Sequence, residues 1–415
     1  MKYVILHADG LSDGPRSDLG ERTPLQAAAT PNLDRLAQSG ELGTVTVPGE
    51  GLHPGSEVSA MAVLGYDPRK YYTGPAPLEA ASLGVTVGEH DVVFCCTMVT
   101  LSSESPQNGH PRDLDVKKLG SYLVMEDATA GCIETEQARE LIDTMNEQLG
   151  SEMIQFYPGM GHRHLMVWAG GKARSVCVDP QQVSGRMVGD YLPSGDGADM
   201  LRRLMDASIA ILRDHPVNDE RQSDGLKPVN CLWLWGQGRA LEWPTIGERY
   251  SFTGAVITGS EVHRGVGICA GLSPVEFSIE SGREASPYEA YGEILEKELG
   301  RHDLLYIHAG LPGDALQGHD VKKQVQAIEE YDRDLVGPLL RLLEQQQAFC
   351  LLVMCNPGSF GGSSQVSAPL MYLLCESPLR PGASGRQFNE ADANAAGVPP
   401  REATKILTKV LSRGA

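Results

Sequence analysis

The chain has 415 residues, of which 41% are hydrophobic and 21% are charged, and this length favours two domains over a single core. Its formal net charge of −19 argues against a nucleic-acid surface, because phosphate backbones are bound by clustered Lys and Arg. With no run of about eighteen apolar residues and no charged-then-apolar leader, the sequence predicts neither a membrane span nor a signal peptide.

Apolar runs of strand length recur along the chain, bounded by turn residues and alternating with helical patterns. In chain order, the predicted strands are Tyr3–Ala8, Val92–Leu101, Ala255–Gly259, Leu304–His308, Phe349–Met354 and Leu370–Leu374. Runs that are apolar throughout fit parallel strands covered by helices on both faces. We therefore predict a mostly parallel sheet as the core of an α/β fold.

Two of the intervening helices have recognisable ends. Thr30 is predicted to cap a helix that has Pro31 at its first position and Gly40 at its end. Apolar residues at helical spacing predict a second helix over Val321–Leu343, interrupted at Gly337.

The sequence pattern changes at Ser102, and the new pattern continues to about Val178. Polar turns there surround a helical pattern and a short strand, His164–Trp168. We predict a smaller α+β domain over residues 102–178, inserted into a core domain formed by residues 1–101 and 179–415.

The nine cysteines lie mostly inside apolar runs and lack Cys-x-x-Cys spacing. Free thiols of this kind are typical of a reducing compartment. The pattern predicts buried, reduced cysteines in a cytoplasmic protein, with neither a disulfide framework nor a zinc knuckle.

A glycine-rich turn around Ser56 is the first candidate for chemistry. Pro54 and Gly55 precede this serine, and a sharp turn can present a serine hydroxyl as a nucleophile. An isolated turn of this kind is common in ordinary loops. Its significance comes from the acidic residue Asp9, which ends the first predicted strand, and from other short blocks along the chain.

These blocks are Asp9-Gly10, Thr23–Ala28, Thr30–Asp34, Pro54–Ser56, Gly65–Pro68, Pro77–Ala80, His215–Asn218 and Trp233–Gly238. In this order they resemble the archaeal-type, 2,3-bisphosphoglycerate-independent phosphoglycerate mutases of the alkaline phosphatase superfamily. The resemblance implies an alkaline phosphatase-like α/β core with an inserted domain that caps the active site and holds the glycerate part of the substrate.

The resemblance also implies a reaction and its cofactors. An isomerase of this family moves a phosphoryl group between the 3- and 2-oxygens of glycerate through a phosphoserine, here Ser56. Two divalent ions, Mn, Mg or Zn, would activate the serine oxygen and neutralise the phosphate. The expected partner is a small phosphorylated metabolite, with no nucleic acid and no membrane.

Not all of the implied metal ligands are present. Asp9 matches the first ligand of the family. Asp314 and His319 match a later Asp and His pair only if the loop carries a two-residue insertion; without a gap, Gly313 and Gln317 occupy those positions. Both alignments stay open.

The last ligand block is substituted. Cys355, Asn356 and Gln365 stand where the family has an aspartate and two histidines. Amide carbonyls are weak ligands, and a thiolate suits zinc better than magnesium or manganese. This predicts the loss of the two-metal site, so the cofactor is either a divalent ion or none. His7 and His308 lie within apolar strands, where satisfied core histidines are expected.

Three residues are candidates for substrate contacts. Arg163 and His164 keep the family's pattern in the inserted domain, and Arg264 stands where the family usually has Lys. The two arginines could equally be ion-pair partners. Other basic positions of the family are lost at Thr73–Ala76 and Phe94–Thr97.

The leading prediction is a phosphoglycerate mutase that acts through Ser56. One alternative is a degenerate, metal-poor homologue with a binding or regulatory role. Another is a phosphotransferase or phosphatase that acts on a different small metabolite and uses one ion near Asp9, Ser56, Asp314 and His319.

Overall fold

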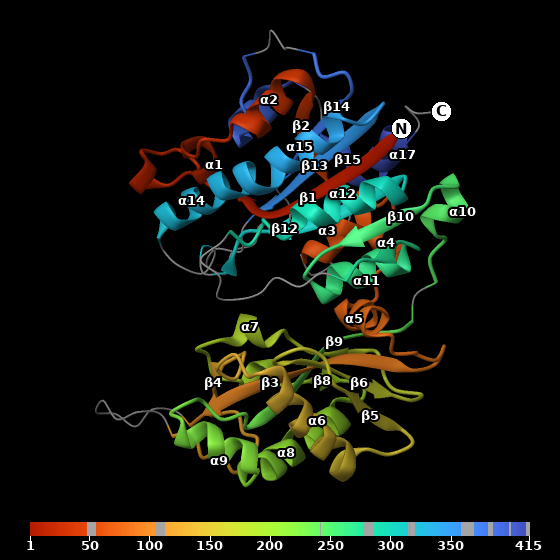
Figure 1. The fold of residues 1–415 in the computed structure, drawn as a ribbon. Helices are drawn as coiled ribbons and strands as arrows, with labels where there is room; N and C mark the ends of the chain where they lie inside the picture. The colour runs from red at the N-terminus through yellow and green to blue at the C-terminus, as the bar shows by residue number, and fades with distance from the viewer. Residues whose placement is uncertain are drawn as a thin grey trace. The chain divides into compact units, whose positions relative to one another are not determined.

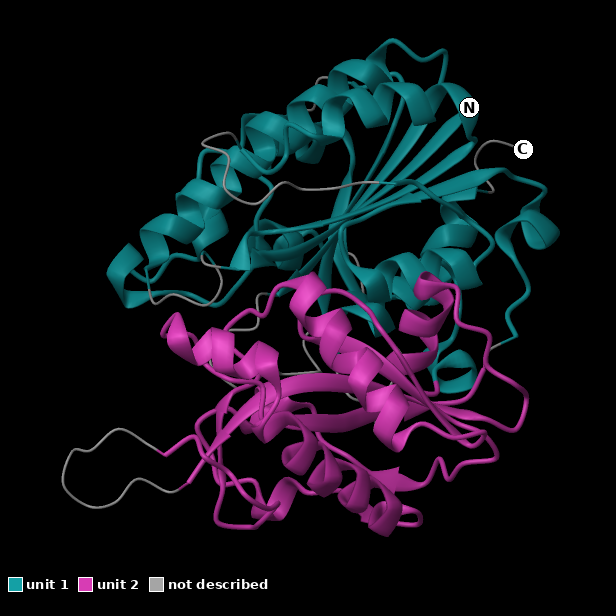
Figure 2. Ribbon diagram, turned by 60° about the horizontal axis from the view of Figure 1, so that its bottom comes forward, with its two compact units in different colours: residues 1–72, 242–415 teal, residues 73–241 magenta. Residues whose placement is uncertain are grey.

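The computed structural model describes residues 1–47, 55–103, 113–240, 242–276, 286–313, 315, 320–357, 369–380, 385–397 and 400–411. The chain divides into two compact units (Figure 2). Unit 1 consists of residues 1–72 and 242–415, and unit 2 consists of residues 73–241. No helix among the described residues has both the length and the apolar character needed to cross a membrane.

Unit 1 is built on one sheet, whose described strands run in the order β11-β10-β12-β1-β13-β14-β2-β15 (Figure 1). They are β1 (Lys2–Ser12), β2 (Glu41–Thr46), β10 (Gly254–Ile257), β11 (Ser273–Pro274), β12 (Leu304–Gly310), β13 (Phe349–Pro357), β14 (Leu370–Glu376) and β15 (Arg401–Glu402). The central strands β10, β12, β1 and β13 are parallel, whereas β14 is antiparallel to β13 and β2. The predicted α/β class with a mostly parallel sheet is confirmed.

The helices of unit 1 lie on both faces of this sheet (Figure 1). They are α1 (Pro24–Ala27), α2 (Pro31–Ser39), α3 (Ser56–Val63), α4 (Pro68–Tyr71), α10 (Ile246–Tyr250), α11 (Glu261–Cys269), α12 (Tyr291–Arg301), α14 (Val321–Tyr331), α15 (Gly337–Glu344), α16 (Glu390–Ala395) and α17 (Ile406–Leu411).

Alternate residues of β1 serve different purposes. Val4, Leu6 and Ala8 belong to the hydrophobic core that includes residues of α2, α14 and α15. Side chains alternate along a strand, so His7 and Asp9 point to the opposite face. Helices α3 and α11 pack on that face, through hydrogen bonds and ring contacts that define the site described below.

The start of α2 is held by a distant carboxylate. Thr30 occupies the predicted cap position, but its side chain makes no capping hydrogen bond. The buried Asp332 instead accepts the backbone N–H groups of Asn32 at 3.1 Å and Leu33 at 2.8 Å. Asp332 begins a π-helical turn, Asp332–Val336, that separates α14 from α15 within the predicted long helix.

Unit 2 contains an antiparallel sheet in the order β4-β3-β6-β5, with β9 paired to β3. Its strands and helices are β3 (Val92–Ser102), β4 (Val124–Asp127), β5 (Ile154–Tyr157), β6 (Arg163–Trp168), β7 (Ser175–Val176), β8 (Ser194–Gly195), β9 (Cys231–Gly238), α5 (Pro75–Leu83), α6 (Thr135–Leu149), α7 (Pro180–Val183), α8 (Ala198–Arg213) and α9 (Pro216–Ser223). One face packs against α6 and α8, and the other packs against α5.

The boundaries of unit 2 differ from those predicted for the inserted domain. The predicted span, 102–178, lies inside the unit, but residues 73–101 and 179–241 also belong to it. Strand β3 pairs with β6 on one side and with β9 on the other, so it is central to this sheet. A central antiparallel strand and a parallel strand both give a continuous apolar run. For this reason the sequence pattern assigns the run Val92–Leu101 to the core domain.

Candidate active site

The parallel strands of unit 1 bring polar residues together near their carboxyl ends. Asp9 of β1 is in register with Gly310 of β12 and with Asn356 of β13, and His7 is in register with His308. Ligands of open α/β sheets bind at this edge. The arrangement makes this end of the sheet the candidate active site.

Asp9 lies at the centre of the cluster. Its Oδ2 is 2.9 Å from His308 Nε2, and its Oδ1 accepts a hydrogen bond of 2.8 Å from Asn356 Nδ2. From α11, His263 stacks on His308 with ring centroids 3.4 Å apart and an angle of 8° between the planes. Ligand atoms of Asp9, His263 and His308 all lie within 4.8 Å of one another, so this group could hold a metal ion.

Hydroxyl groups hold the outer nitrogens of both stacked histidines. Thr258 Oγ1 lies 3.0 Å from His308 Nδ1, and Ser260 Oγ lies 3.0 Å from His263 Nδ1. Thr258 and Ser260 follow β10 and lead into α11, so one short segment orients both rings. The Nε2 atoms are thereby directed to the cluster.

A chain of hydrogen bonds connects the cluster to Ser56. Tyr306 Oη lies 2.9 Å from His7 Nδ1, and His7 Nε2 lies 3.2 Å from Ser59 Oγ. Ser59 also accepts from Asn356 Nδ2 at 2.8 Å and donates to the backbone carbonyl of Ser56 at 2.8 Å. With His7 Nε2 as a donor, the Ser59 hydroxyl uses its one hydrogen and both lone pairs.

Ser56 is the first residue of α3 and is half-buried. The unpaired N–H groups at a helix N-terminus attract anions, which suits a serine that carries a phosphoryl group. Gly55 precedes it, and a Cβ on Gly55 would lie 2.0 Å from a carboxylate oxygen of Glu57. Glu57 in turn accepts a hydrogen bond of 2.6 Å from the Tyr72 hydroxyl.

Two histidines of the site, His7 and His263, are electrostatically suited to remain neutral. Burial, with a smaller contribution from His308, lowers the pKa of His7 to about 4. The same two causes lower the pKa of His263 well below its usual value. The Ser56 backbone approaches the His263 ring without hydrogen-bond geometry and acts weakly in the opposite direction. Neutral imidazole is the form that binds metals.

The carboxyl group of Asp9 remains ionised. Burial by itself would raise the pKa of Asp9, but the charge and hydrogen bond of His308, with contributions from His7 and His263, lower it well below its usual range. An ionised carboxylate is the form that binds a divalent cation.

Two atoms of this cluster lack partners. His263 is only 3% exposed and Asn356 only 6%. Neither His263 Nε2 nor Asn356 Oδ1 has a hydrogen-bond partner among the described residues. Buried polar atoms are normally paired, so these two atoms are available to a ligand.

The other predicted ligands have different outcomes. Asp314, His319 and Gln365 lie outside the described residues. Cys355 belongs to the hydrophobic core on the face opposite the cluster, because it alternates with Asn356 along β13. Burial raises the pKa of its thiol well above the usual value, which disfavours the thiolate that a metal would need.

The candidate substrate residues of unit 2 do not share a surface. Arg163 is paired with the buried Glu79 on the face that packs against α5, and its guanidinium lies 5.7 Å from the Trp235 ring. Because side chains alternate along β6, the next residue, His164, points to the other face. His164 is 1% exposed, and its Nδ1 accepts the Gly159 N–H at 3.0 Å. The contacts of His164 support a packing role.

Arg264 lies in unit 1, next to His263 on α11. Its guanidinium donates to the exposed Glu276 at 2.9 Å, while its buried Nε has no partner among the described residues. The predicted role of Arg264 in substrate binding stays a prediction.

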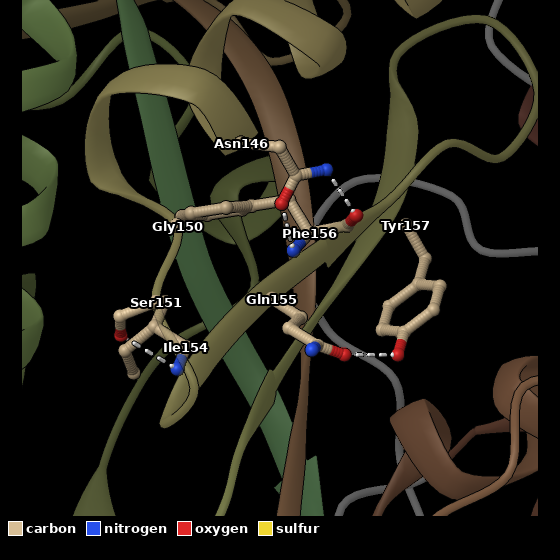
Figure 3. Close-up of a pocket in the computed structure, with 7 residues that line it drawn as sticks. All are labelled: Asn146, Gly150, Ser151, Ile154, Gln155, Phe156 and Tyr157. Carbon is tan, nitrogen blue, oxygen red and sulfur yellow. Dashed lines mark hydrogen bonds between the residues drawn. The ribbon is translucent and has the colours of Figure 1, made fainter.

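A cavity of about 450 Å³ lies in unit 2. Figure 3 shows the residues that line it. Asn146 lines it and holds the backbone of Phe156 through both its amide atoms. Another cavity in the same unit, of about 600 Å³, has both acidic and basic side chains in its lining. The first has no ionisable side chain apart from Tyr157, so it does not provide the groups that phosphoryl transfer needs.

The sequence does not single out His263, and it predicts a core role for His308, whereas the structure brings both next to Asp9. His308 ends a predicted strand, as Asp9 does, and the ends of neighbouring parallel strands meet at one edge of a sheet. That shared position was an available signal. For His263, a lone histidine in a helix, the sequence offers no comparable signal.

Comparisons with known proteins place these observations in a family. The model of the 2,3-bisphosphoglycerate-independent phosphoglycerate mutase family matches residues 37–218. A probable 2,3-bisphosphoglycerate-independent phosphoglycerate mutase of Geobacter sulfurreducens is 36% identical over 414 residues, covering 100% of both chains. A 2,3-bisphosphoglycerate-independent phosphoglycerate mutase of Methanosarcina acetivorans is 38% identical over 357 residues, covering 85% of each chain.

Solved structures show the same fold. A Pyrococcus horikoshii protein matches with a TM-score of 0.72 and 20% identity, covering 99% of this chain and 96% of that one. The cofactor-independent phosphoglycerate mutase of Thermoplasma acidophilum matches with a TM-score of 0.60 and 24% identity, covering 100% of both chains.

Proposed function

The chain belongs to the 2,3-bisphosphoglycerate-independent phosphoglycerate mutase family, and we propose that it interconverts 2- and 3-phosphoglycerate through a phosphoserine at Ser56. The observation that carries this proposal is the position of Ser56. It begins α3, and Ser59 connects its backbone to the cluster around Asp9.

The reaction consists of two transfers at Ser56. Its Oγ attacks the phosphorus of 3-phosphoglycerate, the bond from phosphorus to the 3-oxygen breaks, and the hydroxyl proton passes to that oxygen. The 2-hydroxyl of the bound glycerate then attacks the phosphoserine, and its proton returns to Ser56 Oγ. The N-terminus of α3 stabilises the negative charge that develops in both transfers.

The cofactor of this reaction is a divalent ion. The ionised Asp9, the imidazoles of His263 and His308, and the unpaired Nε2 of His263 fit a cation. When bound, a divalent ion lowers the pKa of the serine hydroxyl and neutralises phosphate charge.

We assign Arg163 and Arg264 as candidate contacts for the anionic groups of the substrate, since each can offer N–H donors to a phosphate or carboxylate. The contacts of His164 do not support such a role. We place the protein in the cytoplasm, because all nine cysteines are free in the described structure.

A binding or regulatory protein is the second candidate. Asn356 favours it, because this residue directs an N–H donor toward Asp9 from a position where the resembled family has a metal ligand. The carboxylate of Asp9 can only accept a hydrogen bond, so it fixes the Asn356 amide with Nδ2 toward Asp9. The Oδ1 atom of Asn356 is therefore not available as a ligand on the side that faces Asp9.

Conversion of 3-phosphoglycerate, followed by phosphorus NMR without 2,3-bisphosphoglycerate, separates the two candidates. Turnover in the wild type that is abolished in Ser56→Ala supports the mutase. Ser39→Ala is a matched control, because the half-buried Ser39 hydroxyl donates to the backbone carbonyl of Arg35 within α2, and the variant should keep full activity. No turnover by folded, metal-supplemented protein would favour the binding role.

A further inference from the structure

We propose that Asp9, His263 and His308 bind a single transition-metal ion of the zinc type, in place of the two-ion site that the resemblance implies. The ion's role in catalysis rests on the proposed function, because it would be held beside Ser56. The existence of the site does not, since metal binding can be measured without turnover.

The spacing of the donor atoms suits one ion. Oδ2 of Asp9 and Nε2 of His308 are 2.9 Å apart, and the donor atoms of all three residues lie within 4.8 Å of one another. Two ligands that are each about 2.0–2.1 Å from a zinc ion are separated by roughly 3 Å. The Asp9 and His308 pair therefore needs little movement to share an ion.

The unpaired nitrogen of His263 is the independent sign of a ligand. This side chain is buried, and its Nε2 has no partner among the described residues although Nδ1 is bound to Ser260. A buried nitrogen left in this state destabilises the fold unless something binds it. A cation shared with Asp9 and His308 would satisfy it.

The contacts behind the ligands have the form found at metal sites. Metal-binding histidines are oriented through their other ring nitrogen, and here Thr258 and Ser260 hold both Nδ1 atoms. Each partner is a hydroxyl, which can donate or accept. His308 can therefore release its Nε2 proton when an ion binds and keep its bond to Thr258 in the other tautomer.

Asn356 supports the site as an orienting residue. Its amide nitrogen donates to Asp9 Oδ1, which leaves Oδ2 beside His308. Where the resembled family has a metal ligand, this chain therefore has a residue that fixes the carboxylate of Asp9.

The donor set determines the type of ion. Magnesium and calcium prefer oxygen ligands, whereas imidazole nitrogen favours zinc and the neighbouring transition metals. Two imidazoles with one carboxylate should therefore select zinc over magnesium. Among the described residues, Asp9, His263 and His308 are the group of His, Cys, Asp or Glu with this spacing.

The test is a zinc titration of the full-length protein after chelator treatment, with a chromophoric chelator as competitor. We expect one equivalent of zinc in the wild type and an affinity lower by about 100-fold or more in His263→Leu and in His308→Leu. His90→Leu is the matched control, because His90 is exposed in unit 2 and should leave the affinity unchanged.

Thermal unfolding provides a second readout that also reports folding. Without metal, His263→Leu should unfold at the same temperature as the wild type or higher, because leucine removes the unpaired nitrogen. Zinc should raise the midpoint of the wild type but not that of the variant, and magnesium should raise neither.

Two results would overturn the proposal. One is unchanged zinc affinity in His263→Leu. The other is loss of zinc binding in a double variant, Asp314→Asn with His319→Gln, together with zinc binding that survives in His263→Leu. That result would assign the ion to the ligands that the family alignment implies. Zinc binding of the proposed kind without mutase turnover would instead refute only the proposed function.

Discussion

At the scale of single residues, the site depends on atoms that have no alternative partners. Ser59 uses its hydrogen and both lone pairs in bonds to Ser56, His7 and Asn356. Outside the site, in unit 2, His164 accepts one backbone N–H in a buried position. The effect of replacing Ser59 on kcat, and of replacing His164 on stability, can therefore be calculated from the hydrogen bonds that each residue makes.

Ser59→Ala should lower kcat by about tenfold with little change in KM, because one hydrogen bond that positions Ser56 is worth roughly 1 to 1.5 kcal/mol. Steady-state kinetics would measure this. Ser59→Thr retains the hydroxyl and should recover most of the loss, whereas equal kcat values for the wild type and Ser59→Ala would contradict a positioning role.

The stability of the protein should fall on acidification through His164. Burial, followed by the neighbouring His162, lowers the pKa of His164 to about 3. The unfolded chain has a pKa near ~6.5, so it binds the extra proton first and folding loses free energy as the pH falls below that value. From this residue alone, about 2 kcal/mol should be lost by pH 5.

Urea unfolding at pH 7 and pH 5 would test this, with His164→Asn as the comparison. Asparagine can accept the Gly159 N–H but does not titrate, so the variant should lose about 2 kcal/mol less than the wild type between the two pH values. Equal losses would show that His164 does not contribute to the acid sensitivity.

At the scale of elements, helix starts and strand ends are determined by contacts across the fold. The N-terminus of α2 is capped by Asp332, about 300 residues away in the chain. The predicted local cap, Thr30, makes no such bond.

Asp332→Ala should reduce the free energy of unfolding by about 2–3 kcal/mol, since it leaves two N–H groups of α2 without an acceptor. Urea denaturation would measure the change. Glu344→Gln is the control: it removes an exposed ion pair between α15 and Arg35 of α2, and should cost no more than about 1 kcal/mol. Similar losses in both variants would argue against a special role for the cap.

At the scale of the whole molecule, the chain forms two units with separate hydrophobic cores. Unit 2 is continuous in sequence, whereas unit 1 is formed from two segments. The core of unit 2 includes Phe94 of β3, Ile209 of α8 and Trp233 of β9, all outside the span 102–178.

A fragment of residues 73–241 should therefore fold by itself and unfold cooperatively, because it contains this entire core. A fragment of residues 102–178 should not, because it lacks the central part of β3 and all of β9. Circular dichroism during thermal unfolding would compare the two. Cooperative unfolding of the shorter fragment would favour the boundaries predicted from sequence.

The sequence by itself determined the α/β class, the positions of the main strands, and Asp9 and Ser56 as candidates. These follow from local apolar patterns and from short motifs. Strand alternation alone also implies that Arg163 and His164 point to opposite faces.

Only the tertiary structure decided which residues surround Asp9. His308 is 299 residues away in the chain and Asn356 is 347 residues away, yet both bond to its carboxylate because β12 and β13 flank β1. His263 joins them through the packing of α11. Which residues become neighbours depends on strand order and helix packing, and the sequence by itself shows only that His308, like Asp9, ends a predicted strand.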